Sequence, residues 1–194
     1  MACIALTKGR GLDCNRSSGG VKYIYFGVYD QFTAPIVGTG ILVVNSEITD
    51  IEMGAGTGLY RYTVPRGSTN IQESITGSTE NGTIFYTPTV SMVLNRLSKE
   101  DQNEIKLLGQ TQVVVFAQLN QQLANGHDVI VGLGVTNAMQ LNAGTADSGT
   151  AFADRNGYTL NFDGFEADPF PIVADYTTDP FDNAAFTMGT IVTS

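Results

Sequence analysis

The chain has 194 residues, of which 42 % are hydrophobic and only 15 % are charged, and its formal net charge is −9. Residues 1–22 are basic, with four bases against one acid, whereas residues 108–194 hold nine acids and one base. This distribution excludes a basic groove that grips phosphates. Free monomers usually carry about 25 % charged residues, so we expect neighbouring molecules to cover much of this surface. An acidic surface kept for solubility is the alternative.

The first twenty residues are basic and rich in glycine and serine, which predicts an extended N-terminal arm over residues 1–20. The start lacks the apolar core of a secretion signal, so we expect synthesis and use in a cytosol. Cys3 and Cys14 are then expected to be reduced thiols, with a disulfide as the unusual alternative. Two cysteines and the single His127 cannot build a standard structural zinc site without carboxylates.

Three strands are predicted over residues 21–29, 36–44 and 46–53, followed by a flexible glycine-rich turn at residues 54–58. The turn resembles a dinucleotide-binding loop but has Leu59 where the fingerprint requires glycine. No helix follows to hold a pyrophosphate, so the pattern excludes a nucleotide site.

Residues 59–97 predict one very long β-hairpin. From Thr83 to Asn95 the side chains alternate between two faces, which is about twice the usual strand length. The turn at residues 79–82 ends in Asn81-Gly82, a strong hairpin signal. At roughly 3.3 Å per residue the strand spans about 40 Å. A hairpin too long for its own core requires a partner outside it, which favours assembly over catalysis.

One helix is predicted to begin after Ser98, an N-cap residue followed by acids in the first turn. Ile105 and Leu108 give it an apolar face, and Gly109 is a natural residue just beyond its end. Strands follow at residues 112–119, buried on both sides, and at 126–134, 140–141 and 158–163. We predict a polar loop over residues 144–156 and a loosely structured acidic tail over residues 167–194.

No residue stands out as catalytic, cofactor-binding or metal-binding. His127 lies at a turn, where a solvated side chain is expected. The stretch 154–157 resembles part of a calcium loop but lacks a third ligand, so a plain turn is expected. The absence of tryptophan gives a sugar-binding cleft little support. We therefore expect no enzyme activity and no cofactor.

Taken together, these elements predict one mainly β domain over residues 1–194. We expect a β-barrel or β-sandwich with a long extended hairpin and one flanking α-helix.

Two stretches resemble those of a group of bacteriophage tail proteins. The first comprises Met1-Ala2-Cys3, Leu6-Thr7-Lys8-Gly9-Arg10, Leu12, Cys14, Gly19-Gly20-Val21-Lys22 and Tyr25-Phe26. The second comprises Asp154-Arg155-Asn156-Gly157-Tyr158-Thr159-Leu160-Asn161-Phe162 with Gly164, Glu166 and Pro169. Between them, the order of hairpin, helix and return strands is similar to that of tail tube proteins of phages and related injection machines. The final acidic segment, residues 167–194, departs from the pattern.

The resemblance implies a virion structural protein that forms stacked, hexameric rings, assembled in the host bacterial cytoplasm. DNA would pass through the tube without specific binding, and the partners would be other copies and other tail proteins, with no membrane. One alternative is another phage structural protein, such as a tail terminator, a connector or a head-decoration protein. The other is a carbohydrate-binding or enzymatic β-sandwich.

Within this frame the hairpin is expected to mediate assembly. The residues expected to take part are Arg66, Thr69, Ile71, Ile75, Asn81 and Gly82. Glu73 and Glu80 are candidates to line an acidic lumen that keeps DNA mobile. Alternatively, they face the next ring and pair with Lys8, Arg10 or Arg16 of the basic arm.

Overall fold

The computed structural model describes residues 9–10, 18–32 and 40–193. The expectations for Cys3, Cys14, Lys8 and Arg16, and for the first part of the strand predicted at residues 36–44, therefore lie outside the described residues. The described part is mainly β, with two sheets, one α-helix and a 3₁₀ turn at Tyr29–Gln31.

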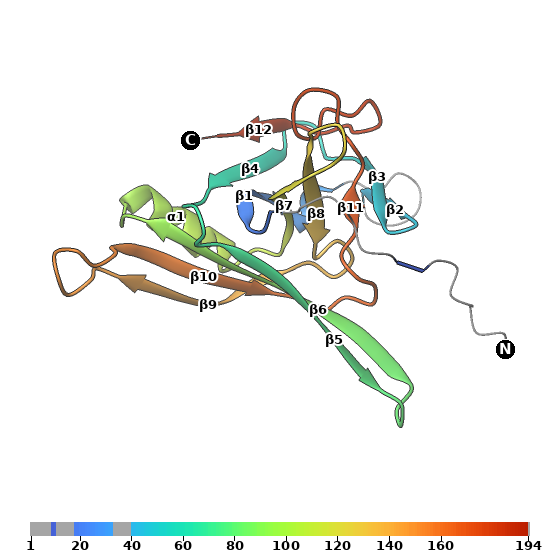
Figure 1. Ribbon diagram of the computed structural model, residues 1–194. Coiled ribbons are helices and arrows are strands. Elements are labelled where there is room, and N and C mark those ends of the chain that lie inside the picture. Colours follow the sequence, from blue (N-terminus) through green and yellow to red (C-terminus); the bar gives the residue numbers. More distant parts are fainter. Residues whose placement is uncertain (1–8, 11–17, 33–39, 194) are drawn as a thin grey trace.

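The larger sheet has eight strands in the order β12-β4-β1-β7-β8-β11-β3-β2 (Figure 1). Its pairings are antiparallel except β11 with β3 and β12 with β4, which are parallel. In chain order the strands are β1 (Val21–Val28), β2 (Ile41–Val44), β3 (Glu47–Ile51), β4 (Gly58–Thr63), β7 (Val113–Gln122), β8 (Asp128–Leu133), β11 (Ile172–Val173) and β12 (Thr190–Val192).

The smaller sheet has four antiparallel strands in the order β5-β6-β10-β9. These strands are β5 (Asn70–Ser78), β6 (Thr83–Asn95), β9 (Gln140–Asp147) and β10 (Gly157–Asp163). Figure 1 shows the end of the β5–β6 hairpin extending well beyond the rest of the molecule. The sandwich-like arrangement confirms the predicted fold class, and the described strands form no closed barrel.

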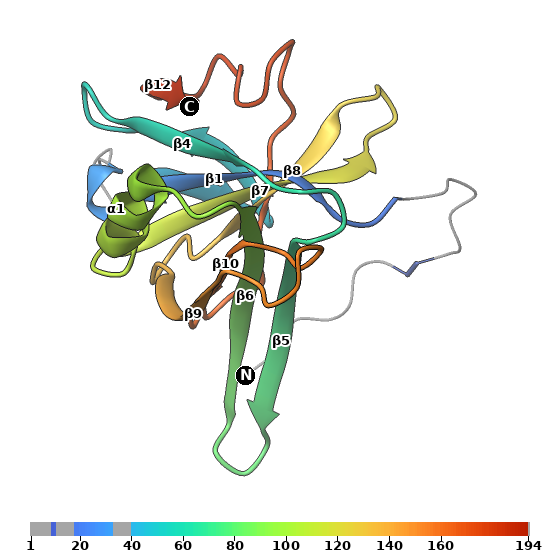
Figure 2. The same ribbon diagram turned by 90° about the vertical axis from the view of Figure 1, so that its left-hand side faces the viewer.

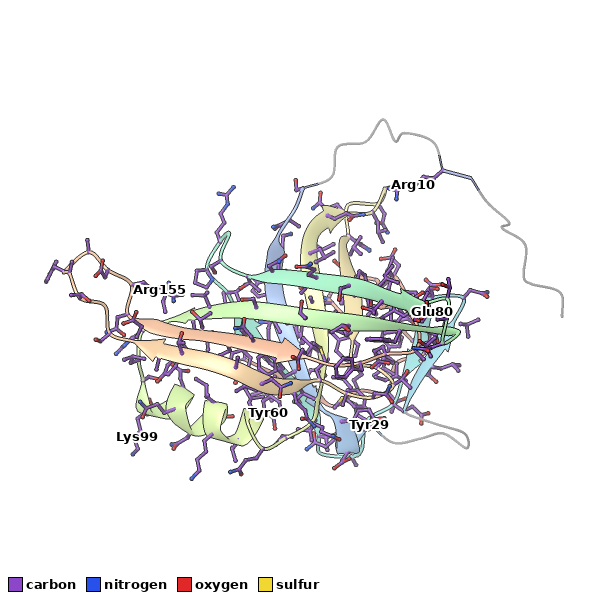
Figure 3. The ribbon with its side chains drawn as sticks, turned by 90° about the horizontal axis from the view of Figure 1, so that it is seen from below. Arg10, Tyr29, Tyr60, Glu80, Lys99 and Arg155 are labelled. Carbon is purple, nitrogen blue, oxygen red and sulfur yellow. The ribbon has the colours of Figure 1, made fainter. Side chains whose placement is uncertain are left out.

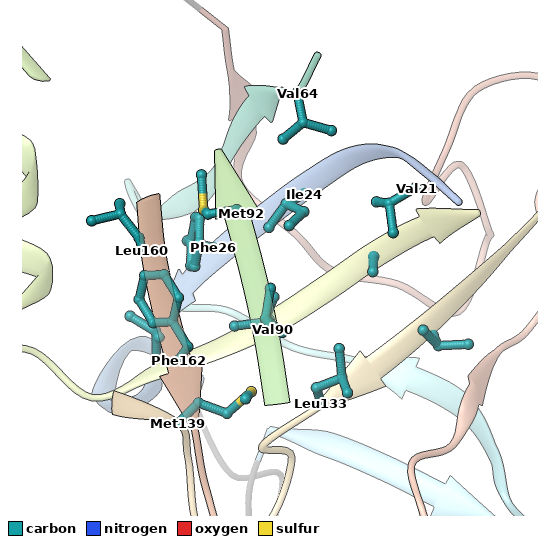
Figure 4. Packing of buried hydrophobic residues seen from close by; sticks show 14 of the residues in the cluster. Val21, Ile24, Phe26, Val64, Val90, Met92, Leu133, Met139, Leu160 and Phe162 are labelled. Carbon is teal, nitrogen blue, oxygen red and sulfur yellow. The ribbon is translucent and has the colours of Figure 1, made fainter. Parts of the chain in front are cut away.

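One hydrophobic core lies between the two sheets (Figure 4). Ile24 and Phe26 of β1 meet Met92 of β6 and Phe162 of β10, and all four side chains are at most 1 % exposed. The rings of Phe26 and Phe162 lie 5.0 Å apart between centroids. Burying side chains of this size stabilises the fold by about 1.5–3 kcal/mol each.

A second core covers the opposite face of the same central strands. Tyr25 and Phe116 pack there against Ile48 and Ile51 of β3 and against Phe181, which lies beyond β11. The central strands are therefore buried on both faces, which explains the continuous apolar run of β7. The prediction of a doubly buried strand at residues 112–119 is confirmed.

The predicted helix is present as α1 (Lys99–Leu108). The Ser98 hydroxyl accepts a hydrogen bond from the Asp101 N–H at 3.0 Å, so the expected N-cap is confirmed. Ile105 and Leu108 are half-buried against the inter-sheet core. Gly109 ends the helix at φ −70°, a right-handed conformation, and its N–H donates to the Ile105 carbonyl at 2.9 Å.

Residues 59–97 do not form one hairpin. Strand β4 pairs with β1 and β12 in the larger sheet, and only β5 and β6 form the hairpin. The chain changes sheets at residues 64–69, where a turn places Gly67 at φ +73°. The physical reason is that Leu59 is fully buried in the second core, which holds β4 against the larger sheet.

Two further expectations are wrong. The predicted polar loop at residues 144–156 begins only after Asp147, because β9 pairs with β10 up to that residue through backbone hydrogen bonds. The acidic segment 167–194 is not a loose tail, since it contributes β11 and β12 and buries Val173 and Phe181. It also joins distant strands: Thr187 exchanges backbone hydrogen bonds with Ile51 and Met53, just before the chain enters β12.

Candidate interaction surface

The outer part of the β5–β6 hairpin stands away from the body as a two-stranded ribbon. Strand β10 pairs with β6 only from Asn95 to Thr89, whereas β5 continues along β6 to the pair of Ser78 and Thr83. Beyond Thr89, the edge of β6 opposite β5 is supported by a hydrogen bond from the Gly164 N–H to the Pro88 carbonyl at 3.2 Å and by one bridge between Tyr86 and Glu166. Figure 2 shows this ribbon leaving the body (residues 75–85 are called the ribbon below). Isolated two-stranded hairpins are marginally stable in water.

Both faces of the ribbon carry exposed apolar side chains. Ile75 is 65 % exposed and Ile84 is 60 % exposed. Both lie on one face of the ribbon, because Ile75 pairs with Tyr86 and Ile84 stands two residues before Tyr86 on β6. Phe85 lies on the other face, with its ring 5.9 Å from the exposed ring of Phe165. A body packed against only one face could not cover both sets of side chains. Exposed apolar clusters of this kind mark interaction sites.

The base of the hairpin is held to the body by the Glu73 carboxylate, and the Glu166 carboxylate fixes the neighbouring segment of the body. Glu73 accepts a hydrogen bond from the Phe170 N–H at 2.9 Å. Glu166, which is buried, accepts from the N–H groups of Thr136 and Asn137 at 3.2 and 3.0 Å. Burial raises the pKa of Glu73 above its usual value, the Phe170 N–H opposes this shift, and the negative charge of Glu166 adds to it. Glu73 is thus a half-buried anchor of the hairpin base.

The tip of the hairpin is a polar turn, as the sequence predicts. Gly82 adopts φ +63°, a left-handed conformation that suits glycine. The Asn81 N–H donates to the Ser78 hydroxyl at 3.3 Å. Glu80 is exposed at the far end of the hairpin, at the opposite end of the molecule from Arg155 (Figure 3).

The predicted assembly residues therefore divide into two groups. Arg66 lies exposed in the turn before β5, Thr69 is buried, and Ile71 packs against the inter-sheet core. Ile75, Asn81 and Gly82 belong to the ribbon or its tip. The two lumen candidates divide in the same way, with Glu73 at the base and Glu80 at the tip. Their lumenal role stays a prediction.

His127 is not a freely solvated turn residue. Its Nδ1 lies 2.8 Å from Asp175 Oδ1, and its ring stacks on Tyr176 with centroids 4.5 Å apart. Asn125 also donates to Asp175, at 2.5 Å. These contacts fasten the segment after β11 to the turn between β7 and β8. The hydrogen bond from His127, together with those from Asn125 and the Tyr176 N–H, outweighs desolvation and lowers the pKa of Asp175.

The stretch that resembles a calcium loop is a plain turn. Asp154 Oδ2 accepts hydrogen bonds from the backbone N–H groups of Ala151 and Thr150 at 2.6 and 2.9 Å, which lowers the pKa of Asp154. Throughout the described ranges, no three His, Cys, Asp or Glu side chains gather as metal ligands would. The helices placed by the structure include none with the length and apolar character needed to cross a bilayer.

Sequence reasoning missed three members of this surface: Ile84, Phe85 and Phe165. Ile84 and Phe85 lie in the alternating strand, but alternation alone does not tell which face stays uncovered. Phe165 follows β10 and comes near Phe85 only through the bridge between Tyr86 and Glu166.

Comparison with protein-family models, with curated proteins and with solved structures finds no match to this chain.

Proposed function

We propose that the protein is a structural subunit that assembles with copies of itself, using the ribbon as its principal contact. The observation that carries this proposal is the ribbon itself, a two-stranded extension with exposed apolar side chains on both faces. A contact with a neighbouring subunit buries Ile75, Ile84 and Phe85. Each such side chain contributes about 1.5–3 kcal/mol when it leaves water.

The strand edges of the ribbon offer a second attraction. β5 is the outermost strand of its sheet, and β6 loses its β10 partner beyond Thr89. Unpaired backbone N–H and C=O groups on such edges pair readily with a strand from another chain. Copies of one protein present this edge repeatedly, so the same contact closes a ring or continues as a stack.

We further propose that the assembly is a stacked-ring tube of the bacteriophage tail type. The resemblance in the opening stretch and in residues 154–169 supports this finer assignment. The net charge of −9 suits a channel that repels phosphate and keeps DNA mobile.

The central experiment shortens the ribbon and leaves its base intact. Residues 75–86 are replaced by Asn-Gly, which closes a two-residue turn on the pair of Ser74 and Thr87, because the backbone groups of Tyr86 point away from β5 toward Glu166. The wild-type protein should form rings and tubes at high concentration, seen by negative-stain electron microscopy and sedimentation. The shortened protein should remain a folded monomer.

A matched control removes an exposed aromatic residue elsewhere. Phe152 lies fully exposed in the loop after β9, so Phe152→Ser should assemble as the wild type does, whereas the double variant Ile75→Ser, Ile84→Ser should not. Normal tubes from the shortened protein would refute the ribbon as the contact. A wild type that stops at single rings would favour a terminator or connector, and a persistent monomer would contradict self-assembly.

The lumenal role is best tested at Glu80, because Glu73 is half-buried and its replacement would disturb the hairpin base. If Glu80 lines the lumen, Glu80→Lys should leave tubes intact and make them retain DNA in a salt-dependent way. If Glu80 bridges rings, the same change should abolish stacking, and reversing Arg10 to Glu should partly restore it.

A further inference from the structure

A groove runs between α1 and β4, on the side of the molecule away from the ribbon tip. It comprises a hollow of about 680 Å³ and a neighbouring one of about 190 Å³, and both are lined by Tyr60, Tyr62 and Glu104. Figure 3 shows Tyr60 beside the helix that begins at Lys99. The larger hollow alone falls within the range of about 300–1,000 Å³ that is typical of binding sites.

The floor of the groove is apolar and firmly supported. Tyr60 is 41 % exposed, Leu107 55 % and Val192 47 %, and all three line the groove. Beneath them the Tyr62 ring packs edge-on against the buried Phe26, with centroids 5.2 Å apart. The floor therefore offers an exposed apolar surface that rests on the inter-sheet core.

The rim that α1 contributes is acidic. Glu100, Asp101 and Glu104 line the groove, whereas the helix's Lys99 and Lys106 do not. Residues three and four positions apart share one face of a helix, so the acids gather on the groove side. Burial raises the pKa of Tyr62 to about 12, with further upward contributions from the charges of Glu104 and Asp101.

One base also lines the groove. Arg61 comes from β4, and its guanidinium carbon lies 4.9 Å from the centre of the Tyr23 ring. This cation–π contact holds Arg61 toward Tyr23, and the three helix acids outnumber this one base, so the rim is net negative.

We propose that this groove docks the basic segment, residues 1–20, of a second copy of the chain. The proposal rests on the self-assembly proposed above. Residues 1–20 contain Lys8, Arg10 and Arg16 against the single acid Asp13, with apolar residues such as Leu12 between them. An acidic rim over an apolar floor complements that combination. The rest of the chain is net acidic, and the ribbon tip carries the acid Glu80. The acidic rim repels both, which leaves the basic segment as the complementary occupant.

The position of Arg10 favours a second copy over the same chain. Arg10 lies on the far side of the molecule from Lys99 in Figure 3, and residues 9–10 lie far from α1 in Figures 1 and 2 as well. Residues 9–10 are thus displayed away from the groove of their own chain, which favours the groove of a neighbour as their docking place.

The test uses two charge-reversed full-length proteins. The groove variant carries Glu100→Lys and Glu104→Lys, which are exposed, and spares Asp101, which hydrogen-bonds Ser98. The segment variant carries Lys8→Glu and Arg10→Glu. We expect each variant alone to require about a tenfold or greater increase in concentration to assemble. An equimolar mixture should assemble as the wild type does, because each groove then meets a segment of opposite charge on its neighbour.

A control with the same change of charge, Glu47→Lys with Asp179→Lys, lies on exposed positions outside the groove and should assemble normally. Unchanged thermal unfolding of the groove variant shows that it folds.

The outcomes separate the two proposals. Normal assembly of both variants, in a wild type that assembles, would overturn the docking site and leave self-assembly standing. A chain that carries both sets of reversals could assemble normally while the mixture of the two variants does not. That result would show that the segment binds the groove of its own chain, and it would overturn docking on a second copy. A wild type that never assembles would overturn both proposals.

Discussion

The central strands of the larger sheet and the ribbon are both regular β-structure, yet their surroundings are opposite. From Val113 to Gln118, β7 is buried at every position, with a core on each face. In the ribbon, most positions are exposed on both faces. An alternating pattern therefore defines the two faces of a strand, but the other elements of the fold decide which faces are covered. The uncovered faces of the ribbon are the ones on which the proposed contact between subunits rests.

The sharpest test of this comparison removes one phenylalanine from each region. Phe116 is fully buried beside Phe32 and Phe181, so Phe116→Ala should lower the free energy of unfolding by about 3–5 kcal/mol. Phe85 is 36 % exposed in the ribbon, so Phe85→Ala should lower the free energy of unfolding by about 1 kcal/mol or less. Urea denaturation of the monomer measures both values.

Assembly should reverse this ranking. Phe85→Ala should impair tube formation while its monomer stays stable. Equal losses of monomer stability from the two variants would show that the ribbon packs against the body in solution.

The second test concerns the polar contacts of the central strands. Lys22 donates to Asp128 at 2.6 Å, and Gln118 donates to Asp128 at 2.8 Å while accepting from the Tyr25 hydroxyl. Burial alone would raise the pKa of Asp128, but the hydrogen bonds from Lys22, Gln118 and Gln122 outweigh it and lower that pKa. Asp128→Ala should destabilise the monomer by about 2–3 kcal/mol, because it leaves the buried Gln118 amide without its acceptor and removes the ion pair with the part-buried Lys22.

Glu80→Ala is the matching substitution in the ribbon, because it removes an acid that is exposed at the ribbon tip. It should change the free energy of unfolding by less than about 0.5 kcal/mol. A similarly small effect of Asp128→Ala would show that water replaces the lost contacts.

A smaller effect is expected at the helix that flanks the inter-sheet core. Ser98→Ala removes the side-chain acceptor of the Asp101 N–H and should cost about 1 kcal/mol. Ser98→Asp should restore most of that loss, because aspartate is also a good N-cap. If neither change alters thermal unfolding, helix α1 is held by Ile105 and Leu108 rather than by its cap.

The smallest effect concerns the clasp between His127 and Asp175. The folded-state pKa of Asp175 is lowered, so the unfolded state binds more protons once the pH falls below the usual aspartate value of 3.8. The stabilisation is therefore complete above that value and is lost as the pH falls further. Asp175→Asn should lose less stability than the wild type between pH 4 and pH 2 in thermal unfolding (roughly the range of aspartate titration). Parallel curves would show that the clasp contributes nothing.

Local patterns predicted much of the fold. Ser98 located the start of α1, Asn81-Gly82 located the hairpin turn, and the apolar run at residues 112–119 identified a doubly buried strand. Only the first two residues of β9 were predicted as a strand, because nearly all its side chains are exposed and it is held to β10 through backbone hydrogen bonds. The role of β4 was misassigned because continuous alternation cannot reveal that the chain changes sheets after Thr63.

The candidate interaction surface was also predicted only in part, because some of its features are local in sequence and others depend on distant contacts. Ile75, Glu80 and the turn at residues 79–82 were identified, since length and turn chemistry are local properties. Thr69 and Glu73 were grouped with them although they belong to the body, and the pairing of Glu73 with the Phe170 N–H joins segments far apart in sequence. The contact between His127 and Asp175 likewise depends on how the final segment folds back.

The parallel pairing of β12 with β4 has a consequence for the order of events during synthesis. Ile191 lies beside Leu59, so this edge of the larger sheet stays open until nearly the whole described chain has emerged from the ribosome. Closing so long a loop carries an entropic cost and slows folding. Val192 also lines the groove beside α1. In the proposed assembly, a nascent chain therefore lacks a finished docking groove, and a subunit can join its neighbours only after β12 has docked.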